Sequence, residues 1–361
     1  MKSLKFAIPI LIAISILVTS QVVLGNPTPN NANSSVHLTS AVQIQASIDD
    51  GINIEQGVVE ANPLNNDQPS QYILANQSQP LVLTDQFVSK QWALTSIQIS
   101  SLWQITTGSQ DIVVAILDTG IDKNHEDLGG QIKAEVNFTD APTPDDIYGH
   151  GTHIAGIIAA KNNSIGIVGL APGCRLLNVK VADDRGRCQV SDLVEGIIWA
   201  VDNGANVINI SIEIKESSQD LEEAINYAWN HGAVVIAAAG NNGSQSPVYP
   251  ASYENCIAVA AFKENNSLAP LSNRGDWINL AAPGFQIYST LPGSNYGFET
   301  GTSFAAAHVS GIAALLFTKV TDTNGNGHLN DEVLAMIETG CQETGISGVG
   351  RGYIDAAKVV V

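Results

Sequence analysis

The chain has 361 residues, 44% of them hydrophobic and 14% charged, which is enough apolar material for one large core. Sixteen basic residues against 35 acidic ones give a net charge of −19, which argues against a nucleic-acid partner because a polyanion requires clustered lysine and arginine. An acidic surface suits a secreted protein or one that collects cations.

The N-terminus has the features of an export signal. Lys2 and Lys5 precede a short apolar run over residues 6–18, and small and polar residues follow up to Gly25. This order predicts a secretory signal peptide over residues 1–25, and therefore a secreted protein, extracellular or periplasmic. An uncleaved anchor is the alternative, but the apolar run is short for a membrane span, so we expect no membrane association after signal removal.

Residues 26–83 are rich in Asn, Gln, Ser and Pro, with only weak apolar patches. Such a segment is too polar to build a core of its own size. Its place between an export signal and a globular region predicts a pro-segment or a linker. Residues 84–361 then form the folded domain.

From residue 111 onward, apolar runs alternate with helical patterns. The run Asp-Ile-Val-Val-Ala-Ile-Leu-Asp at 111–118 is continuous and β-branched, which is typical of strands buried on both faces. Helices are expected at 191–203 and from the capping box at 217–220 to Gly232. The alternation predicts an α/β domain with a doubly wound, largely parallel sheet and helices on both faces. Further strands are expected at 176–181, 206–212, 233–239 and 256–261.

Four reactive side chains fall at the carboxyl ends of these strands or at the starts of helices, where active sites of such sheets gather. Asp118 ends the first strand, His150 opens a helix, and Asn241 follows the strand at 233–239. Ser303 lies in the first turn of a buried helix, where free N–H groups and the helix dipole favour negative charge. A serine that only caps the helix is the alternative.

This set meets the requirements of nucleophilic catalysis. A serine hydroxyl is a weak nucleophile at neutral pH, so a histidine must take its proton and a carboxylate must hold the histidine tautomer. We therefore expect Ser303 to attack, His150 to transfer the proton and Asp118 to orient His150. The side chain of Asn241 and the backbone N–H of Ser303 would hold the oxyanion.

Three other chemistries fit fewer of these residues. An aspartic peptidase would need a second motif like Asp118-Thr119-Gly120, which the chain lacks. A zinc pair of His150 and His153 has no nearby Glu or Cys to complete it, so we expect His153 to pack and hydrogen-bond within its helix. A lipase elbow needs glycine where Ala305 stands.

The same residues resemble a known family. Asp118-Thr119-Gly120, His150-Gly151-Thr152-His153, Ala239-Gly240-Asn241 and Gly301-Thr302-Ser303 are similar to the four signature blocks of the subtilisin-like serine peptidases, in the same chain order. The resemblance runs from about residue 85 to the end. It implies a subtilisin-like fold and an endopeptidase that cleaves polypeptide substrates through an acyl-enzyme.

Two positions near the serine depart from the family pattern. Phe304 stands where members usually carry Met, and Ala307 stands where they carry Pro. A ring behind the nucleophile would crowd or tighten the site, and Ala307 removes a kink. Neither change removes a reacting atom, so we expect an active enzyme. The alternative is a catalytically silent subtilase-fold module that binds peptides or calcium.

The resemblance also implies a groove in which an extended peptide adds as a strand beside residues 185–189 and 211–213. Cys188 and Glu213 stand where members commonly have glycine. We hypothesise that Val248 makes the primary pocket shallow and that Glu213 on its rim favours basic or polar residues, with a solvent-facing Glu213 as the alternative. The substrate-binding residues implied are Gly186, Cys188, Ser211, Ile212, Glu213, Ala239, Gly240 and Val248.

Residues 162–169, Asn-Asn-Ser-Ile-Gly-Ile-Val-Gly, resemble the calcium loop of the family, and oxygen ligands suit a hard cation. A second candidate at 322–327 has the spacing of an EF-hand loop but lacks the acid at the twelfth position, where Val333 stands, so a polar turn between helices is favoured. The resemblance implies one structural calcium ion, held by the side chains of Asp85, Asp127 and Asn163 and the carbonyls of Lys161, Ile165 and Ile167.

The remaining expectations concern cysteines and partners. Four cysteines in an exported chain permit three disulfide pairings, and their spacing does not choose among them. Cys256 lies in an apolar run and is expected to be a buried thiol. The resemblance implies a monomer whose partners are polypeptide substrates and its own pro-segment. Residues 26–83 are, however, short for the folding-assisting inhibitor of such enzymes.

Overall fold

The computed structural model describes residues 16–19, 42–46, 57–59 and 83–359, and the chain divides into two compact units, 1–76 and 77–361. In the first unit, three short strands pair antiparallel: β1 (Ile16–Thr19), β2 (Val42–Ala46) and β3 (Gly57–Val59). The predicted signal peptide and pro-segment fall mostly outside the described residues and stay predictions. Among the described residues, no helix has the length and apolar character needed to cross a bilayer.

The second unit is built on a nine-stranded sheet in the order β13-β14-β10-β9-β8-β7-β4-β6-β5. Every neighbouring pair is parallel except β13 with β14, which confirms the predicted α/β class. The strands are β4 (Val113–Asp118), β5 (Ile132–Asn137), β6 (Arg175–Lys180), β7 (Val207–Ile210), β8 (Val234–Ala238), β9 (Cys256–Phe262), β10 (Leu280–Pro283), β13 (Cys341–Gln342) and β14 (Tyr353–Ile354).

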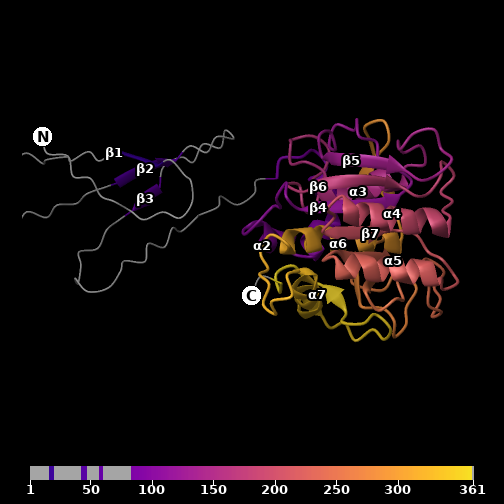
Figure 1. The fold of residues 1–361 in the computed structure, drawn as a ribbon. Helices are drawn as coiled ribbons and strands as arrows, with labels where there is room; N and C mark the ends of the chain where they lie inside the picture. Colours follow the sequence, from indigo (N-terminus) through magenta and orange to yellow (C-terminus); the bar gives the residue numbers. More distant parts are fainter. Residues whose placement is uncertain (1–15, 20–41, 47–56, 60–82, 360–361) are drawn as a thin grey trace, which may run out of the picture. The chain divides into compact units, whose positions relative to one another are not determined.

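Helices cover both faces of this sheet (Figure 1). The pair α3 (His150–Ala159) and α6 (Thr302–Leu316) packs on one face, and the pair α4 (Val190–Asp202) and α5 (Gln219–Asn230) packs on the other. Shorter elements complete the unit: η1 (Val88–Lys90), α1 (Trp92–Ser96), α2 (Ile99–Trp103) and α7 (Asn330–Thr339). A hairpin of β11 (Ile287–Leu291) and β12 (Asn295–Glu299) packs against α3.

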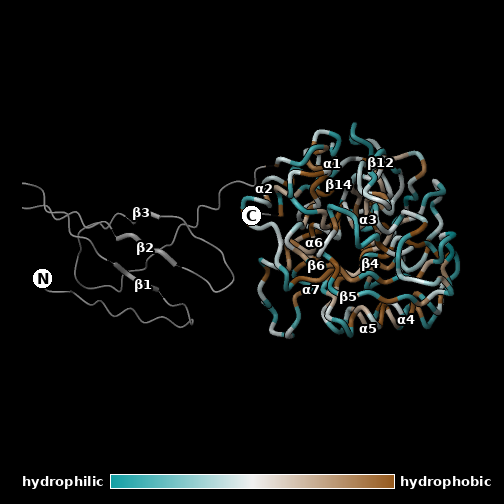
Figure 2. Tube along the Cα trace, turned by 90° about the horizontal axis from the view of Figure 1, so that it is seen from above, coloured by the Kyte–Doolittle hydropathy of each residue, from teal (hydrophilic) through white to brown (hydrophobic). Residues whose placement is uncertain are grey.

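The core follows the apolar runs of the sequence. Every residue of β4 and of α6 is buried, and Figure 2 shows hydrophobic residues along the central strands with hydrophilic ones at the rim. The small side chains of α6, mostly Ala, Gly and Ser, let this helix lie close to β7, β8 and β9. The hydroxyl of Ser218 accepts a hydrogen bond from the amide of Leu221 and caps α5, so the cap lies one residue after Ser217, the first residue of the predicted capping box.

The predicted strands and helices start and end within two residues of the observed ones. In the second unit, the strands β5, β10, β11, β12, β13 and β14 were not predicted. Strand β5 lies at the edge of the sheet and is half-buried along most of its length, so its sequence lacks a continuous apolar run. The segment at 322–327 is a loop between α6 and α7, as expected for a polar turn.

All four cysteines carry free thiols. Cys256 begins β9 and is 4% exposed, which confirms the expected buried thiol. Because burial raises the pKa of Cys174 to about 11, its thiol stays protonated at neutral pH.

Candidate active site

Asp118 and His150 form a hydrogen-bonded pair at the carboxyl edge of the sheet. Asp118 is the last residue of β4 and is 1% exposed, while His150 is the first residue of α3. The Nδ1 atom of His150 lies 2.8 Å from Oδ1 and 2.9 Å from Oδ2 of Asp118. The carboxylate therefore fixes which ring nitrogen carries the proton and leaves Nε2 free to act as a base.

The electrostatics of this pair favour the protonated imidazole. Burial by itself would lower the pKa of His150, but the adjacent carboxylate of Asp118 outweighs it, so that the pKa is raised above its ordinary value of 6.5. The carboxylates of Asp146 and Glu299 add smaller contributions in the same direction. A histidine with a raised pKa is a stronger base once it is neutral, which suits proton abstraction from a hydroxyl.

Ser303 lies in the first turn of α6, as predicted, and is 5% exposed. Ser303, His150 and Asn241 line one cavity of about 420 Å³. In the described part of the chain no hydrogen bond joins the Ser303 hydroxyl to His150. Catalytic hydrogen bonds are often longer in ligand-free enzymes and tighten when substrate binds.

Asn241 is held with its amide nitrogen available to a ligand. Its Oδ1 accepts hydrogen bonds from the amide of Thr302 at 2.8 Å and from the Thr302 hydroxyl at 3.1 Å. Because a backbone N–H can only donate, the atom of Asn241 that faces the Thr302 amide must be its oxygen, which determines the orientation of the Asn241 side-chain amide. Asn241 lines the cavity together with Gly301 and Ser303, and its Nδ2 lies 3.5 Å from the position of a Cβ atom at Gly301. A side-chain amide donor is the kind of group that stabilises an oxyanion.

The ring of Phe304 packs between two histidines. Its centroid lies 5.4 Å from that of His150 and 4.6 Å from that of His153. His153 is fully buried, and its Nε2 lies 3.3 Å from the carbonyl oxygen of Gly297 in β12. The expectation that His153 hydrogen-bonds within its own helix was therefore wrong, because the β11–β12 hairpin supplies the acceptor. Phe304 therefore contacts the imidazole of His150 directly.

Burial keeps two histidines near the site neutral. It lowers the pKa of His153 to about 3 and that of His308 to about 4. The Nδ1 atom of His308 lies 2.7 Å from the carbonyl oxygen of Phe304, so it donates to the turn that carries the serine.

The sequence did not single out Asp146, which connects the two loops that carry Asp118 and His150. Asp146 is 4% exposed and accepts four hydrogen bonds. Its Oδ1 binds the Thr119 hydroxyl at 2.9 Å and the amide of Gly149 at 2.7 Å, and its Oδ2 binds the amide and hydroxyl of Thr152 at 2.8 and 2.7 Å. The acid just before the Gly-His motif was the only sequence signal for this role.

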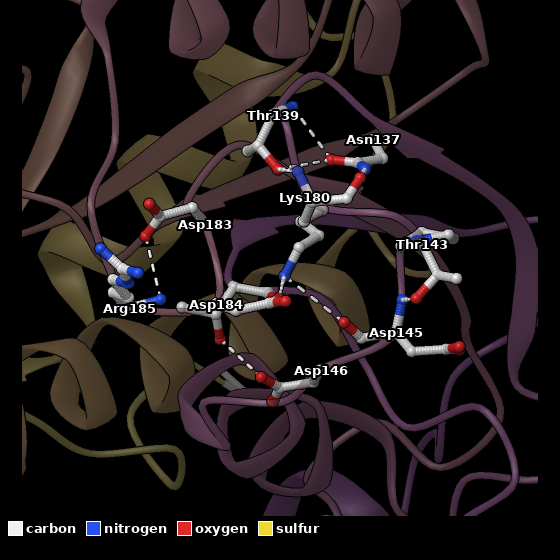
Figure 3. A network of polar contacts seen from close by, with 12 residues as sticks. Asn137, Thr139, Thr143, Asp145, Asp146, Lys180, Asp183, Asp184 and Arg185 are labelled. Atoms are coloured by element: carbon white, nitrogen blue, oxygen red, sulfur yellow. Dashed lines mark hydrogen bonds and ion pairs between the residues drawn. The ribbon is translucent and has the colours of Figure 1, made fainter.

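Lys180, a second residue that was not predicted, binds backbone carbonyl groups of the same two loops. Lys180 ends β6 beside Asp118 and is fully buried, with its Nζ bound to the carbonyl oxygen of Thr119. The same ammonium lies 3.4 Å from the carbonyl oxygen of Asp145 and 3.0 Å from the carboxylate of Asp184 (Figure 3). A lysine at the end of an apolar strand was the available signal, since such a cation must be paired.

The predicted substrate residues near the serine come together around Asn241. The Ser211 hydroxyl donates to the carbonyl oxygen of Ser303 at 3.4 Å. The carboxylate of Glu213 accepts from the amide of Asn241 at 3.3 Å and from Nδ2 of Asn242 at 2.9 Å, so it does not point freely into solvent. A Cβ atom at Gly240 would lie 2.6 Å from Oε2 of Glu213, which places this carboxylate directly against the Gly240 backbone.

The other predicted substrate residues are more dispersed. Gly186 has a φ of +71° and lies against the ring of Tyr148, which lines the active-site cavity. Cys188 pairs with Ala182 in a short bridge. Val248 is 6% exposed, and no contact places it in the active-site cavity. Ile212 is half-buried after β7, and Ala239 is buried after β8.

The predicted calcium ligands converge on the loop that follows α3. The Oδ1 of Asp85 accepts from the amide of Asn163 at 2.9 Å, and Oδ2 of Asp127 accepts from the amide of Ile167 at 2.9 Å. The other carboxylate oxygens, Oδ2 of Asp85 and Oδ1 of Asp127, are buried without a hydrogen-bond partner among the described residues. Desolvation raises the pKa of Asp127. A cation between these carboxylates would remove that cost.

Residues 109–338 match the sequence model of the subtilase family. The chain is 45% identical over 253 residues to a thermophilic serine proteinase of Bacillus sp. (strain AK1), a match covering 70% of this chain and 61% of the relative. It is 42% identical over 280 residues to thermitase of Thermoactinomyces vulgaris, covering 76% and 97%. It is 42% identical over 229 residues to subtilisin BL of Lederbergia lenta, covering 63% and 84%.

Proposed function

This chain belongs to the subtilase family and is a serine-type endopeptidase, and we propose that Ser303, His150, Asp118 and Asn241 carry out its reaction. The observation that carries these roles is the bond from His150 Nδ1 to Asp118 in the wall of the cavity that Ser303 and Asn241 also line. Phe304 and Ala307 leave every one of these groups in place, so a catalytically silent module is not favoured.

In the proposed mechanism, His150 takes the proton of the Ser303 hydroxyl as its oxygen attacks the scissile carbonyl. The negative oxygen of the tetrahedral intermediate binds Nδ2 of Asn241 and the backbone N–H of Ser303. The imidazolium of His150, stabilised by Asp118, then protonates the leaving amine. Water then gives a proton to His150 as its oxygen bonds to the acyl carbon, the ester bond to Ser303 breaks, and His150 returns that proton to the Ser303 oxygen.

For substrate binding, we propose that extended peptides lie beside residues 185–189 and 211–213. Glu213 and Gly240 would contact the substrate residue before the scissile bond. The Glu213 carboxylate packs against the Gly240 backbone and so narrows the pocket for that residue. A small or basic side chain fits such a narrow acidic pocket better than a large apolar one. Val248 as the floor of this pocket stays a prediction.

We further propose that the loop after α3 binds one structural calcium ion. The two buried, unpartnered carboxylate oxygens of Asp85 and Asp127 fit a hard cation. Asn163 and the carbonyls of Lys161, Ile165 and Ile167 would complete an oxygen shell. Among the described residues no group of three or more His, Cys, Asp or Glu side chains could hold a metal, so these carbonyl ligands are essential to the proposal.

The remaining proposals concern the export, the maturation and the oligomeric state of the protein. We propose that it is exported through residues 1–25, that residues 26–83 are removed as a pro-segment, and that the mature enzyme acts as a monomer on polypeptides. N-terminal sequencing of the protein purified from culture medium would test the first two, because a mature chain should begin near residue 84.

The catalytic roles are tested by incubating the purified full chain with an unfolded protein substrate, with and without a serine-directed covalent inhibitor. We expect cleavage that the inhibitor abolishes, with the label on the peptide containing Ser303. The Ser303→Ala protein should neither cleave nor accept the label. Intact substrate after incubation with correctly folded wild-type protein would overturn the proposal.

A further inference from the structure

The active-site cavity extends well beyond the reacting groups. Besides Ser303 and Asn241, its walls include Tyr148, Leu291, Glu299 and Phe304, which surround His150. Its volume of about 420 Å³ is in the range of sites that hold small ligands. Ala239, Gly240 and Glu213, which form the proposed pocket for the acyl side of the substrate, do not line it.

The chemistry of the reaction identifies which half of the substrate enters this cavity. His150 must deliver its proton to the nitrogen of the leaving amine, so that nitrogen has to lie within hydrogen-bond reach of the imidazole. The residue that carries the leaving nitrogen must then lie on the His150 side of Ser303. The walls around His150 therefore contact the first residue after the scissile bond, and we call this space the leaving-group pocket.

The β11–β12 hairpin explains why an acidic side chain reaches this pocket. Glu299 pairs with Ile287 and Gly297 pairs with Ser289, so all four lie on one face of the hairpin. Ser289 donates to the carbonyl oxygen of His153 at 2.8 Å and Thr290 to that of Thr152 at 2.7 Å, which shows that β11 packs against α3. Glu299 ends β12 and lines the cavity together with Thr300 and Gly301, which lead into α6.

Glycine at position 297 leaves room on this face. A Cβ atom there would lie 2.6 Å from Cδ1 of Leu291, so the Leu291 side chain occupies the space in front of Gly297. The pocket thus combines an apolar wall of Leu291 and Phe304 with one carboxylate, that of Glu299. A long side chain with a methylene stem and a positive end matches both parts.

The charges around the pocket are unbalanced. Glu299 is exposed, and no hydrogen bond or ion pair engages its carboxylate in the described part of the chain. No lysine or arginine lines the cavity, and His150 is its only basic side chain. Glu299 is close enough to contribute to the raised pKa of His150. A ligand cation would therefore meet an unpaired carboxylate without displacing an internal partner.

We propose that Glu299 makes the leaving-group pocket selective for arginine or lysine immediately after the scissile bond. This inference rests on the proposed catalytic roles of Ser303 and His150. Glu299 acts here by contacting the substrate side chain, whereas Glu213 would act on the opposite side of the serine. The two preferences are therefore separable by experiment.

The test exploits the reverse of acylation, in which an added amine competes with water for the acyl-enzyme. The amine nitrogen forms a bond to the acyl carbon, the ester bond to Ser303 breaks, and His150 moves the amine proton to the serine oxygen. One ester substrate serves for every measurement, so the acyl side is constant. The competing amines are the amides of arginine, of citrulline as its neutral isostere, and of glutamate.

The measurement is the ratio of aminolysis to hydrolysis at about pH 9, where α-amino groups are largely unprotonated and the guanidinium remains charged. We expect arginine amide to exceed citrulline amide by about three- to five-fold, as for a partly exposed ion pair, with glutamate amide lowest. Raising the ionic strength from about 0.05 to about 0.5 M should shrink this preference, because exposed charges are screened.

Variants of Glu299 separate its charge from its shape. Glu299→Gln should abolish the preference for arginine over citrulline, and Glu299→Lys should make glutamate amide the better acceptor. Residue 299 is exposed, so neither substitution should affect folding. Glu195→Gln, which removes an exposed carboxylate from the middle of α4, is the matched control and should retain the wild-type ratios.

The outcomes distinguish this inference from the proposed function. Equal ratios for all three amines in a wild-type enzyme that hydrolyses the ester would overturn the role of Glu299 and leave the catalytic roles standing. An arginine preference that survives in Glu299→Gln would also overturn it. A protein that neither hydrolyses the ester nor labels at Ser303 would refute the proposed function, and the inference with it.

Discussion

Replacing Asp146 by asparagine tests whether this buried carboxylate positions the catalytic pair. Its four hydrogen bonds come from Thr119, which follows the catalytic aspartate, and from Gly149 and Thr152, which flank His150. Asparagine keeps the shape but replaces one acceptor oxygen by a donor. Hydroxyls can rotate to accept from that amide, but the backbone N–H of Gly149 or of Thr152 then faces another donor.

The structure sets the size of the expected effect. An unsatisfied buried N–H costs about 1–3 kcal/mol. If about 2 kcal/mol of that cost appears as displacement of His150, kcat/KM falls about 30-fold. The loss should appear in kcat more than in KM, because Asp146 contacts neither the substrate groove nor the primary pocket.

The pH profile gives a readout that a merely structural role would not move. The base must be neutral, so kcat/KM rises with pH as His150 loses its proton, and its raised pKa places the midpoint of that rise above 6.5. Asp146 contributes to raising the pKa of His150, so the midpoint in Asp146→Asn should move to lower pH. Active-site titration with a serine-directed reagent corrects each rate for unfolded molecules.

Asp276→Asn is the matched control, since it removes an exposed carboxylate and should leave both kcat/KM and the midpoint unchanged. If Asp146→Asn also kept the wild-type kcat/KM and the wild-type midpoint, Asp146 would not position His150. A loss of activity without a shift of the midpoint would mean that its charge does not reach the imidazole.

Three further predictions follow from the buried and acidic groups. Burial lowers the pKa of His153 to about 3 and that of His308 to about 4. Both histidines are therefore neutral in the folded protein, while the unfolded chain takes up protons below about pH 6.5. The free energy of unfolding is therefore highest above about pH 6.5 and falls as the pH is lowered toward 4. In the Ser303→Ala protein, urea denaturation should therefore give a free energy of unfolding about 4 kcal/mol lower at pH 5 than at pH 7.5, and equal values would contradict this. Glu213→Gly should admit large apolar residues before the scissile bond, and an unchanged cleavage-site profile on a denatured protein would refute that role. A calcium chelator should lower the Tm by about 5–10 °C, whereas Asp127→Asn should have the lower Tm already and no longer respond to the chelator.

The proposed catalytic residues could be predicted from the sequence because the residues next to each of them determine where it lies. Asp118 ends a continuous apolar run, and Asn241 follows another, so each is placed at the carboxyl edge of a parallel sheet by its own strand. His150 and Ser303 stand at the starts of helices made of small residues. No long-range contact is needed to place any of the four at the same edge.

The roles of Asp146 and Lys180 could not be predicted in this way. The partners of Asp146 include Thr119, 27 residues away, and Lys180 bonds the carbonyl oxygen of Thr119 from 61 residues away. The sequence around Asp146 or Lys180 does not indicate which residues will be their hydrogen-bond partners. A buried charge can be suspected from an apolar strand, but its counter-group is known only once the strand order is known.

The edge elements were missed for a different reason. Strands β11 and β12 form a two-stranded hairpin outside the main sheet, and β12 is half-buried or exposed throughout. Such strands lack the continuous apolar run that identified β4. Consequently no local pattern indicated that Glu299 would line the same cavity as His150. The role of Glu213 at the primary pocket, in contrast, was predicted from the sequence and stays a prediction.

The two buried charges near Asp118 and His150 also explain how the neighbouring loops keep their positions. An ammonium or a carboxylate taken out of water costs several kcal/mol unless hydrogen bonds replace its hydration. Lys180 and Asp146 recover that cost only while the segments containing Thr119, Asp145 and Gly149 keep their positions. A shift of either loop would unpair a buried charge, so the loops resist displacement more than their own backbone contacts alone would allow. Burying charge beneath the catalytic pair thus costs stability but restricts the motion of Asp118 and His150.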